Sequence, residues 1–444
     1  MELKALSDVL RNAGIVGAGG AGFPSYAKLD MRADTIILNC AECEPLFKLH
    51  RSLLAKFAFE IMTALSEVKT AVAADRVIIA VKPSYKEAID AVNYHIHSFP
   101  GFEVCELSEF YPAGDEVNTI YEATGRVVKP GALPITVGTT VYNVETMLNA
   151  YYALKSGKPV SSKYLTVAGA VNNPLTFDAP VGMTFKELIA LAGGYSEPDC
   201  AIINGGIMTG FLASESDVVT KTTNAILVLP RNSSIIQRRM TKTTMNVKRT
   251  MSACCQCRSC TDLCSRHLLG HPIQPHLFMR AVALGMESDI EAVLNSAYCS
   301  QCGICEMFSC PQGLSPRTLI GVAKAELRKA NVKLPEPKII PVNKDRDYKL
   351  LAMSRLVGRL GVSKYDVEAP ITELPKMPKT VKIMLSQHIG VPAKATVSVG
   401  DKVKVGDVIG EFTPDKLGVP VHASIDGEVL SVTDSYIVLK GANK

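Results

Sequence analysis

Residues 254–264 read CCQCRSCTDLC, and residues 299–311 read CSQCGICEMFSCP. Each stretch contains C-x2-C-x2-C and then a further cysteine, after three residues in the first stretch and after four in the second. Three thiols at this spacing can curl around one face of an iron–sulfur cubane, while the fourth leaves on a helix start and reaches the neighbouring cluster. The pattern therefore predicts two [4Fe–4S] clusters with crossed ligands. One is expected on Cys254, Cys257, Cys260 and Cys310, and the other on Cys299, Cys302, Cys305 and Cys264.

Zinc and inert structural thiols are the alternatives. A zinc site takes two cysteine pairs and stops at four ligands, whereas a triple occurs here twice. Two features depart from the usual iron–sulfur pattern: Ser265 stands where a proline often follows, and four residues instead of three precede Cys310. Both lie at the crossing ligands, so a distorted helix start is expected there. Cys255 is spare, an inert neighbour that could replace a lost ligand.

The composition is that of a globular protein with two to four domains. The chain has 444 residues, of which 47% are hydrophobic and 20% charged, and its formal net charge is +5, too small to indicate nucleic-acid binding. The start lacks the layout of a signal peptide, and there is no apolar run of about 18 residues, so we expect a cytoplasmic protein without a membrane span. Nine of the 13 cysteines lie between positions 254 and 310, which favours metal ligation over disulfides in that compartment.

The basic excess is partly local. Six basic residues and no acidic residue occur from Arg231 to Arg249. A solvated linker explains this stretch, and a docking strip for an acidic partner is the alternative.

Helix and strand patterns surround the cysteines. Thr35–Asn39 and Arg76–Val81 read as strands between helices, and capping boxes are expected at Ser84 with Glu87 and at Thr184 with Glu187. Valines and Gly-Asp turns near the end of the chain predict an all-β unit. We predict an α/β domain at 1–158, a small β-plus-helix domain at 159–232, a helical cluster domain at 233–332, a linker with a short helix at 333–379 and an all-β domain at 380–444.

A glycine-rich segment lies near the start of the chain. Gly17–Gly22 matches G-x-G-x-x-G, but a helical pattern at Leu6–Asn12 precedes it instead of a strand, so a Rossmann site is not indicated. This many glycines still allow a flat ring or a phosphate to approach the backbone, and Phe23 offers a stacking face. A cofactor loop is favoured over a plain turn.

Residues 14–24, GIVGAGGAGFP, together with Lys28, resemble the flavin subunit of respiratory complex I and, more closely, the C subunit of the Rnf electron-transport complex. The turn Asn39–Pro45 is similar to the Asn-x-x-Glu-x-Glu-Pro turn of that family, and Pro112–Glu116 and Tyr142–Thr146 follow in the expected order. The resemblance covers most of residues 10–150, and residues 160–230 resemble the β-grasp (SLBB) domain that comes next in the family. It implies an FMN-binding α/β domain that also binds NADH.

The resemblance implies roles for individual residues. The glycines would line the FMN ring and phosphate, Lys28 would pair with the flavin or its phosphate, and Phe23 would stack on the nicotinamide. Glu44 and Glu116 would contact the dinucleotide. The full expected cofactor-binding set is Gly17, Gly19, Gly20, Gly22, Phe23, Lys28, Asn39, Glu42, Glu44, Glu116, Asn143 and Thr146. Ala41 replaces an acidic residue of the complex I relative, and Cys40 with Cys43 reads as an incidental C-x2-C.

The C-terminal segment resembles a biotinyl/lipoyl-like barrel sandwich at Gln387–Pro392, Val399–Val403 and Val421–Gly427. The turn Ser424–Gly427 has no lysine to carry a prosthetic group, so a structural or docking module is expected instead of a swinging arm. In the Rnf relative the similar segment comes first, whereas here it comes last. The order of flavin domain, SLBB domain, dicluster domain and terminal barrel resembles the cobalamin reductases of propanediol utilisation.

These features predict an oxidoreductase in which NADH reduces FMN and two [4Fe–4S] clusters pass single electrons to a low-potential acceptor. No side chain is expected to be catalytic by itself, because the cofactors carry the chemistry. The resemblance implies cobalamin as the acceptor, a cobalamin adenosyltransferase and shell proteins as partners, and a location inside a bacterial microcompartment. Two rival functions stay open: a C-type subunit docked on an Rnf-like or other reductase complex, and an electron-wiring module without an NADH site.

Overall fold

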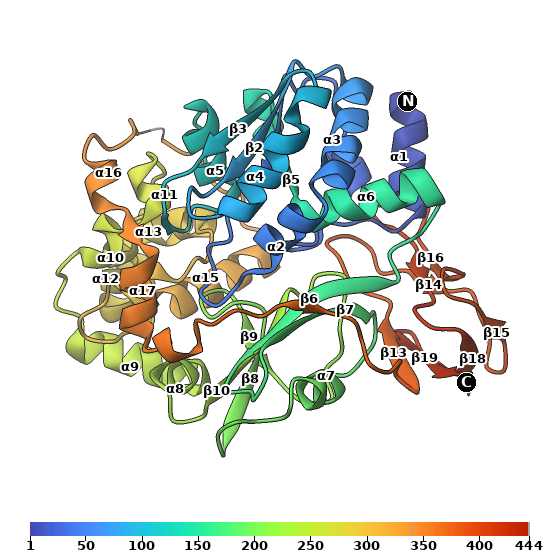
Figure 1. Ribbon diagram of the computed structural model, residues 1–444. Coiled ribbons are helices and arrows are strands. Elements are labelled where there is room, and N and C mark those ends of the chain that lie inside the picture. The colour runs from blue at the N-terminus through green and yellow to red at the C-terminus, as the bar shows by residue number, and fades with distance from the viewer. Residues whose placement is uncertain (339, 443–444) are drawn as a thin grey trace.

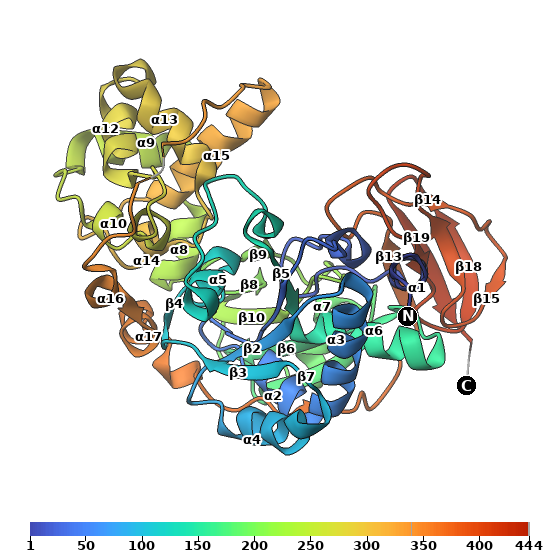
Figure 2. The ribbon, with the colours of Figure 1, turned by 90° about the horizontal axis from the view of Figure 1, so that it is seen from above.

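The computed structural model describes residues 1–338 and 340–442, so position 339 of the expected linker and positions 443 and 444 of the expected all-β domain lie outside it. The described chain forms four structural units and a connecting segment (Figure 1). Seen from above, the helical unit and the C-terminal β unit lie on opposite sides of the two central units (Figure 2). Among the helices described, none is long and apolar enough to cross a membrane.

The first unit is a parallel sheet between two layers of helices. Its strand order is β3-β2-β1-β5, and each neighbouring pair is parallel. Successive residues of β1 enter opposite cores, Ile36 and Leu38 on one face and Ile37 on the other, as a strand covered on both faces requires. The strands are β1 Thr35–Asn39, β2 Arg76–Val81, β3 Phe102–Glu106 and β5 Thr139–Asn143, and the helices are α1 Leu3–Asn12, α2 Leu49–Lys56, α3 Ala58–Val72, α4 Lys86–His95, α5 Glu116–Thr124 and α6 Val144–Ser156.

The two predicted capping boxes have different outcomes. At α4 the box is wrong: Tyr85 is the N-cap, no side chain caps the helix, and the backbone N–H of Ser84 donates to Glu109 at 3.1 Å. A tertiary contact thus replaces the local one. The box of Thr184 and Glu187 is confirmed, because both reciprocal bonds form at the start of α7 (Phe185–Leu191).

The second unit is a mixed sheet of six strands in the order β12-β7-β6-β10-β8-β9. Its central pair, β6 and β10, is parallel, and α7 covers one face through Phe185 and Leu188. This arrangement matches the predicted β-grasp type. The strands are β6 Ser162–Gly169, β7 Leu175–Pro180, β8 Cys200–Asn204, β9 Phe211–Ala213, β10 Ala225–Pro230 and β12 Ile371–Thr372.

The third unit is helical and carries both cysteine runs. Its elements are α8 Ser234–Met240, α9 Thr243–Ala253, α10 Ser259–Asp262, α11 Ser265–Leu268, α12 Pro275–Leu284, α13 Ile290–Asn295, α14 Ile304–Met307 and α15 Pro316–Lys329. The basic stretch from Arg231 to Arg249, read as a linker, forms α8 and most of α9. Arg238 and Arg239 donate to the backbone oxygens of Glu306 and Ile207, so part of this charge holds the unit together.

The segment expected to be a linker adds strands to two sheets. β11 (Leu351–Ala352) pairs with β4 (Phe110–Tyr111) of the first unit, and β12 extends the β-grasp sheet beside β7. Between the two strands, α17 (Met353–Leu360) buries Leu356 and Leu360 in the core shared with the helical unit. α16 (Arg346–Lys349) comes just before β11. Strands of two residues have no readable periodicity, so the sequence could not show this role.

The fourth unit is the predicted all-β module, two small sheets around one apolar core. Their strand orders are β13-β19-β18-β15 and β14-β16-β17. The strands are β13 Thr380–Met384, β14 Lys394–Ala395, β15 Lys402–Val403, β16 Val408–Glu411, β17 Val421–His422, β18 Gly427–Val432 and β19 Tyr436–Gly441.

Lys221 lies at a junction of three units. Its side chain is buried, and its Nζ donates to the carbonyl oxygens of Gly14 at 2.8 Å and of Pro420 at 3.0 Å. Burial lowers the pKa of Lys221 to about 7. A neutral amine has two hydrogens to donate, which is the number that these two carbonyls accept.

This junction predicts a pH-dependent stability. The unfolded lysine keeps a pKa near 10.5, so folding releases a proton between pH 7 and 10.5, and the folded state gains about 1.4 kcal/mol per pH unit as the pH rises through that range. We expect the thermal midpoint to rise between pH 7 and 9, and Lys221→Met to lower the midpoint and remove this rise. Scanning calorimetry of that variant beside Lys404→Met, at an exposed position of the barrel, tests it. An unchanged rise in Lys221→Met would contradict the assignment.

Candidate functional site

A cavity of about 320 Å³ opens between the glycine-rich loop and the carboxyl ends of the parallel strands. This volume lies within the range of small-molecule sites, and the ends of parallel strands are where such sites form. Ten of the twelve residues expected to bind the cofactor line it: Gly17, Gly19, Gly20, Gly22, Phe23, Lys28, Asn39, Glu116, Asn143 and Thr146. Ala21, Ser25, Gly114, Val141 and Tyr142 complete the lining.

The glycine loop is open where a ligand would approach. A Cβ on Gly20 would meet no atom within 4 Å, and its backbone does not need a positive φ. Gly22 differs, since it has φ +75° and a Cβ there would meet His388 and Thr222 at 2.9 Å. Gly20 therefore keeps a free surface beside the cavity, whereas Gly22 lets the loop pack against the barrel and the β-grasp unit.

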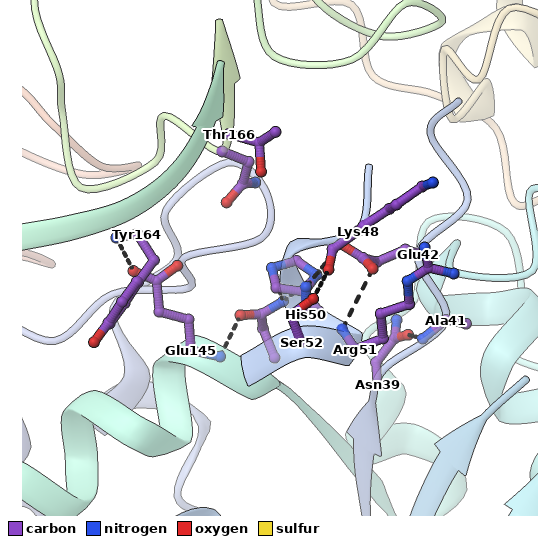
Figure 3. A network of polar contacts seen from close by, with 12 residues as sticks. Asn39, Ala41, Glu42, Lys48, His50, Arg51, Ser52, Glu145, Tyr164 and Thr166 are labelled. Carbon is purple, nitrogen blue, oxygen red and sulfur yellow. Dashed lines mark hydrogen bonds and ion pairs between the residues drawn. The ribbon is translucent and has the colours of Figure 1, made fainter. Parts of the chain in front are cut away.

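Two asparagines hold the walls of the cavity. Asn39, at the end of β1, donates from Nδ2 to the carbonyl of Gly114 at 3.0 Å. Asn143, at the end of β5, accepts at Oδ1 from Glu145 and Thr146 and so caps α6. Both amides are committed to positioning backbone, and Figure 3 shows Asn39 and Glu145 within this polar network.

His50 fixes the orientation of the Asn143 amide. Asn143 Nδ2 lies 3.2 Å from His50 Nε2, and burial lowers the pKa of His50 to about 3. The neutral ring accepts the amide proton, so its contact with the carboxylate of Glu42 at 3.9 Å is not an ion pair. Sequence reading did not single out His50, because only the fold brings it next to Asn143.

The structure places Glu42 and Glu44 away from the cavity lining, contrary to their expected roles. The buried carboxylate of Glu42 caps α2, accepting from the backbone N–H of His50 at 2.7 Å and of Arg51 at 3.3 Å. The carboxylate of Glu44 accepts from Met208 N at 2.7 Å and Thr209 N at 2.9 Å, in a loop of the β-grasp unit. Burial raises the pKa of both carboxyl groups, and these hydrogen bonds oppose the rise. Both side chains are therefore structural in this geometry.

A second cavity of about 340 Å³ adjoins the first. The two share Phe23, Lys28, Glu116 and Val141 as a common wall. Lys28 spans this wall, donating to Glu116 at 3.2 Å and to the carbonyl of Val141 at 2.8 Å. Arg32, Leu133 and Pro134 line the far side, so the second cavity offers both charge and an apolar surface.

The eight cysteines of the two predicted clusters gather into two groups that exchange their last members. Burial raises the pKa of Cys260 to about 12, and Cys257, Cys310 and Cys254 add to the rise. Burial likewise raises the pKa of Cys264 to about 12, with Cys299 next to it, while Cys264 in turn raises the pKa of Cys302 and Cys305. Buried thiols this close need a cationic partner to ionise, as iron would supply.

The backbone repeats itself in the two runs. Gln256 and Gln301, the residues before each second cysteine, have φ of +53° and +61°, and Arg258 and Gly303, the residues after it, have φ of +68° and +85°. Non-glycine residues adopt this region at a cost that is usually accepted at functional sites. Backbone N–H groups of Gln301 and Leu314 also lie 3.3 Å from the sulfurs of Cys299 and Cys310. The loops thus fit an anionic cluster.

The two cysteine groups differ in exposure. Cys255, Gln256, Cys257 and Arg258 are exposed, whereas Cys305 is buried. Across the described residues, no three His, Cys, Asp or Glu side chains converge as a single metal ion would require. Cys40 is buried in the first unit, and Cys43 packs against the core that Tyr111 shares with the helical unit; burial raises the pKa of both thiols, that of Cys43 to about 12.

The cavity wall touches the cysteine group that contains Cys264. Tyr111, three residues before Gly114, donates its hydroxyl to the carbonyl of Cys302 at 2.5 Å. Asp115 accepts from the guanidinium of Arg266 at 2.9 and 3.1 Å. The expected motif Pro112–Glu116 thus borders the cavity and one cysteine group at once.

Family models match the chain unit by unit. Residues 10–152 match a Nuo51 FMN-binding domain, 164–212 an SLBB domain, 253–315 a 4Fe-4S dicluster domain and 362–443 an RnfC barrel sandwich hybrid domain. These matches confirm the predicted fold class. They also support FMN and iron–sulfur clusters as the cofactors.

Two relatives match along almost the whole chain. Cobalamin reductase PduS of Salmonella typhimurium (strain LT2) is 42% identical over 444 residues, covering 99% of this chain and 97% of that protein. Cobalamin reductase PduS of Citrobacter freundii is 41% identical with the same coverage. A component of the Na(+)-translocating ferredoxin:NAD(+) oxidoreductase complex of Acetobacterium woodii, its C subunit, is 34% identical over 274 residues, covering 60% of this chain and 59% of that protein. The resemblances expected from sequence are confirmed.

A solved structure shares the fold. An NAD+-reducing [NiFe]-hydrogenase in its air-oxidized state superposes with a TM-score of 0.50 at 17% identity, covering 83% of this chain and 68% of that one.

The open surface at Gly20 predicts a variant that loses flavin and keeps its fold. Gly20→Val would fill the cavity with a branched side chain, and we expect purified protein with little FMN and unchanged iron content. Absorbance of released flavin and iron analysis measure both quantities. Gly358→Val is the matched control, because a Cβ there also meets no atom within 4 Å. Full flavin in Gly20→Val would refute the cofactor loop.

The exchange of Cys264 and Cys310 predicts which cluster each variant damages. Serine is a poorer iron ligand than thiolate, so Cys264→Ser should damage the cluster of Cys299, Cys302 and Cys305, and Cys310→Ser the other one. In electron paramagnetic resonance spectra of the reduced protein, Cys264→Ser and Cys302→Ser should retain the same cluster signal. A spectrum like that of Cys257→Ser would show that the runs do not cross. Cys255→Ala in the background excludes rescue by that thiol.

Proposed function

The chain belongs to the same family as the cobalamin reductase PduS, and from that membership we propose that it is an NADH-dependent reductase of the corrin cobalt of cobalamin. At the level that the family models support, it is an oxidoreductase of the iron–sulfur flavoprotein type. The observation that supports electron transfer most directly is the Pro112–Glu116 turn. It links the first cavity to the cysteine group of Cys264, Cys299, Cys302 and Cys305, which we call a quartet.

FMN would occupy the first cavity. Gly20 leaves room for the ring, and Glu116 and Thr146, at the starts of α5 and α6, line the cavity. Asp115 and Asn143 cap the first N–H groups of these helices, so the helix dipoles and the positive charge of Lys28 are what favour a phosphate there. When bound, FMN would accept a hydride and release its two electrons one at a time, as iron–sulfur clusters require.

NADH would enter through the second cavity. Phe23 lies on the wall between the two cavities, where it can stack on the nicotinamide and hold it against the flavin side. Leu133 and Pro134 offer an apolar surface for a base. Arg32 and Lys28 are paired with Asp30 and Glu116 of the same cavity, and they would exchange these partners to bind a pyrophosphate. Glu44 takes no part in this proposal, because its carboxylate is engaged by Met208 and Thr209.

Electrons would pass through the two quartets in a fixed order. The quartet of Cys264, Cys299, Cys302 and Cys305 touches the cavity wall through Tyr111 and Asp115 and would receive them first. The quartet of Cys254, Cys257, Cys260 and Cys310 lies beside the exposed residues 255–258 and would deliver them to the acceptor. The names of the full-length relatives support cobalamin as that acceptor, and the microcompartment location stays a prediction.

An anaerobic assay tests donor and acceptor together. NADH should bleach the cluster absorbance near ~400 nm, and added cobalamin should restore it faster than a ferredoxin offered at the same concentration. If dithionite but not NADH bleaches the band, the protein is a wiring module. Faster restoration by ferredoxin would support the Rnf-like alternative over cobalamin reduction.

Phe23 separates dinucleotide binding from the rest of the site. We expect Phe23→Ala to raise the NADH concentration for half-maximal reduction about tenfold, which corresponds to the loss of one aromatic stack. Reduction by dithionite should be unchanged, because it bypasses the second cavity. Phe211→Ala, at an exposed position in the β-grasp unit, is the control. An equal requirement for NADH in both variants would count against the stacking role.

A further inference from the structure

An ion pair lies between the first cavity and the quartet of Cys264, Cys299, Cys302 and Cys305. Asp115 caps α5 through Oδ1, which accepts from Val117 N at 3.1 Å and Asn118 N at 3.3 Å. Its other oxygen, Oδ2, accepts from Arg266 Nε at 3.1 Å and Nη2 at 2.9 Å. Neither side chain is free to turn, because the helix start holds the carboxylate and the carboxylate holds the guanidinium.

The pair is shielded from water. The side chains of Arg266 and Asp115 are 17% and 10% exposed. Beside them, Asn118 Nδ2 donates to Ser265 Oγ at 3.2 Å, and both residues are almost fully buried. Charges in such a place act on their neighbours far more strongly than charges in solvent do.

Arg266 lies two residues after Cys264. An arginine stays protonated, so the guanidinium is a fixed positive charge close along the chain to an expected cluster ligand. On the other side of the pair, Tyr111, four residues before Asp115, donates its hydroxyl to the carbonyl of Cys302 at 2.5 Å.

Two other cations contact the second cysteine run. Lys324 of α15 donates to the carbonyl of Cys299 at 2.7 Å, and Arg317 of the same helix donates to that of Gln301 at 3.0 Å. These contacts reach the backbone of the second cysteine run. Arg266 differs from them, because it is also paired with Asp115, whose neighbours Gly114 and Glu116 line the first cavity.

We propose that Asp115 and Arg266 are positioning residues that set the reduction potential of the cluster held by Cys264, Cys299, Cys302 and Cys305. The inference rests on the proposed function, which supplies the cluster. Reduction adds a negative charge to a cluster, so a nearby cation raises its potential and a nearby anion lowers it. The two members of the pair therefore act in opposite directions on the same cluster.

Potentiometric titration with dithionite, followed by paramagnetic resonance, measures the effect on each cluster of the holoprotein. Arg266→Gln should lower the potential of the Cys264 cluster, Arg266→Lys should restore most of it, and Asp115→Asn, which keeps an oxygen to cap α5, should raise it. The cluster of Cys254, Cys257 and Cys260 should stay at its wild-type potential. Arg280→Gln, at an exposed ion pair of the same unit, is the matched control and should shift neither cluster.

The opposite signs separate this role from a structural one, since a loosened domain contact would move the potential in the same direction for both variants. Shifts of equal sign, equal shifts of both clusters, or a shift no larger than that of Arg280→Gln would overturn the proposal. The titration needs neither NADH nor cobalamin. A wild-type protein that ignores NADH but whose variants show the opposite shifts would therefore refute the proposed donor and support the role of the ion pair.

Discussion

The short turn from Pro112 to Glu116 both borders the first cavity and binds the helical unit. Gly114 and Glu116 border the first cavity, while Asp115 between them pairs with Arg266 on the other side of the backbone. A Cβ on Gly114 would collide with the carbonyl of Ala41, so the turn also packs tightly against the acidic turn after β1. The border of the cavity and Arg266 therefore cannot move independently. This fixes the distance between the flavin cavity and the quartet of Cys264, Cys299, Cys302 and Cys305.

Similar buried polar contacts hold the remaining units in one arrangement. Glu145 of α6 pairs with Lys163 of β6, and both side chains are 1% exposed. Removing one partner of such a pair costs about 3–5 kcal/mol, because the other charge is left without compensation, whereas exposed pairs contribute about 0–1 kcal/mol. Glu44 and Lys221 join other units through buried hydrogen bonds to backbone groups. Electron relay depends on a fixed arrangement of the units, since the flavin is expected on the first unit and both clusters on the third.

Spacing and composition predicted the cysteine runs, the glycine loop and the outline of the units, whereas the resemblance to the flavin-subunit family implied the order of the units and most of the cavity lining. Cysteine spacing is a local property, and so is the crowding of glycines at 17–22, which is why both were readable. Glu42 and Glu44 were expected at the cofactor because their motif identifies the turn but not the hydrogen-bond partners of the two carboxylates. Those partners, α2 and the loop at 207–209, come close only in the folded chain. His50, Tyr111 and Arg266 were missed for the same reason. The two-residue strands β11 and β12 are too short to leave a pattern.

The barrel at the end of the chain packs against its beginning. Gly418 donates its backbone N–H to the hydroxyl of Tyr26 at 3.4 Å, Pro420 shares Lys221 with Gly14, and Figure 2 shows α1 beside the barrel strands. The start of α1 and the end of β19 lie far apart, at the top and the bottom of Figure 1. A gene that encoded the barrel ahead of the glycine loop would need a new connection that spans this separation to keep these contacts. With that connection, the position of this module along the polypeptide can change through genetic rearrangement, while its position in space is retained.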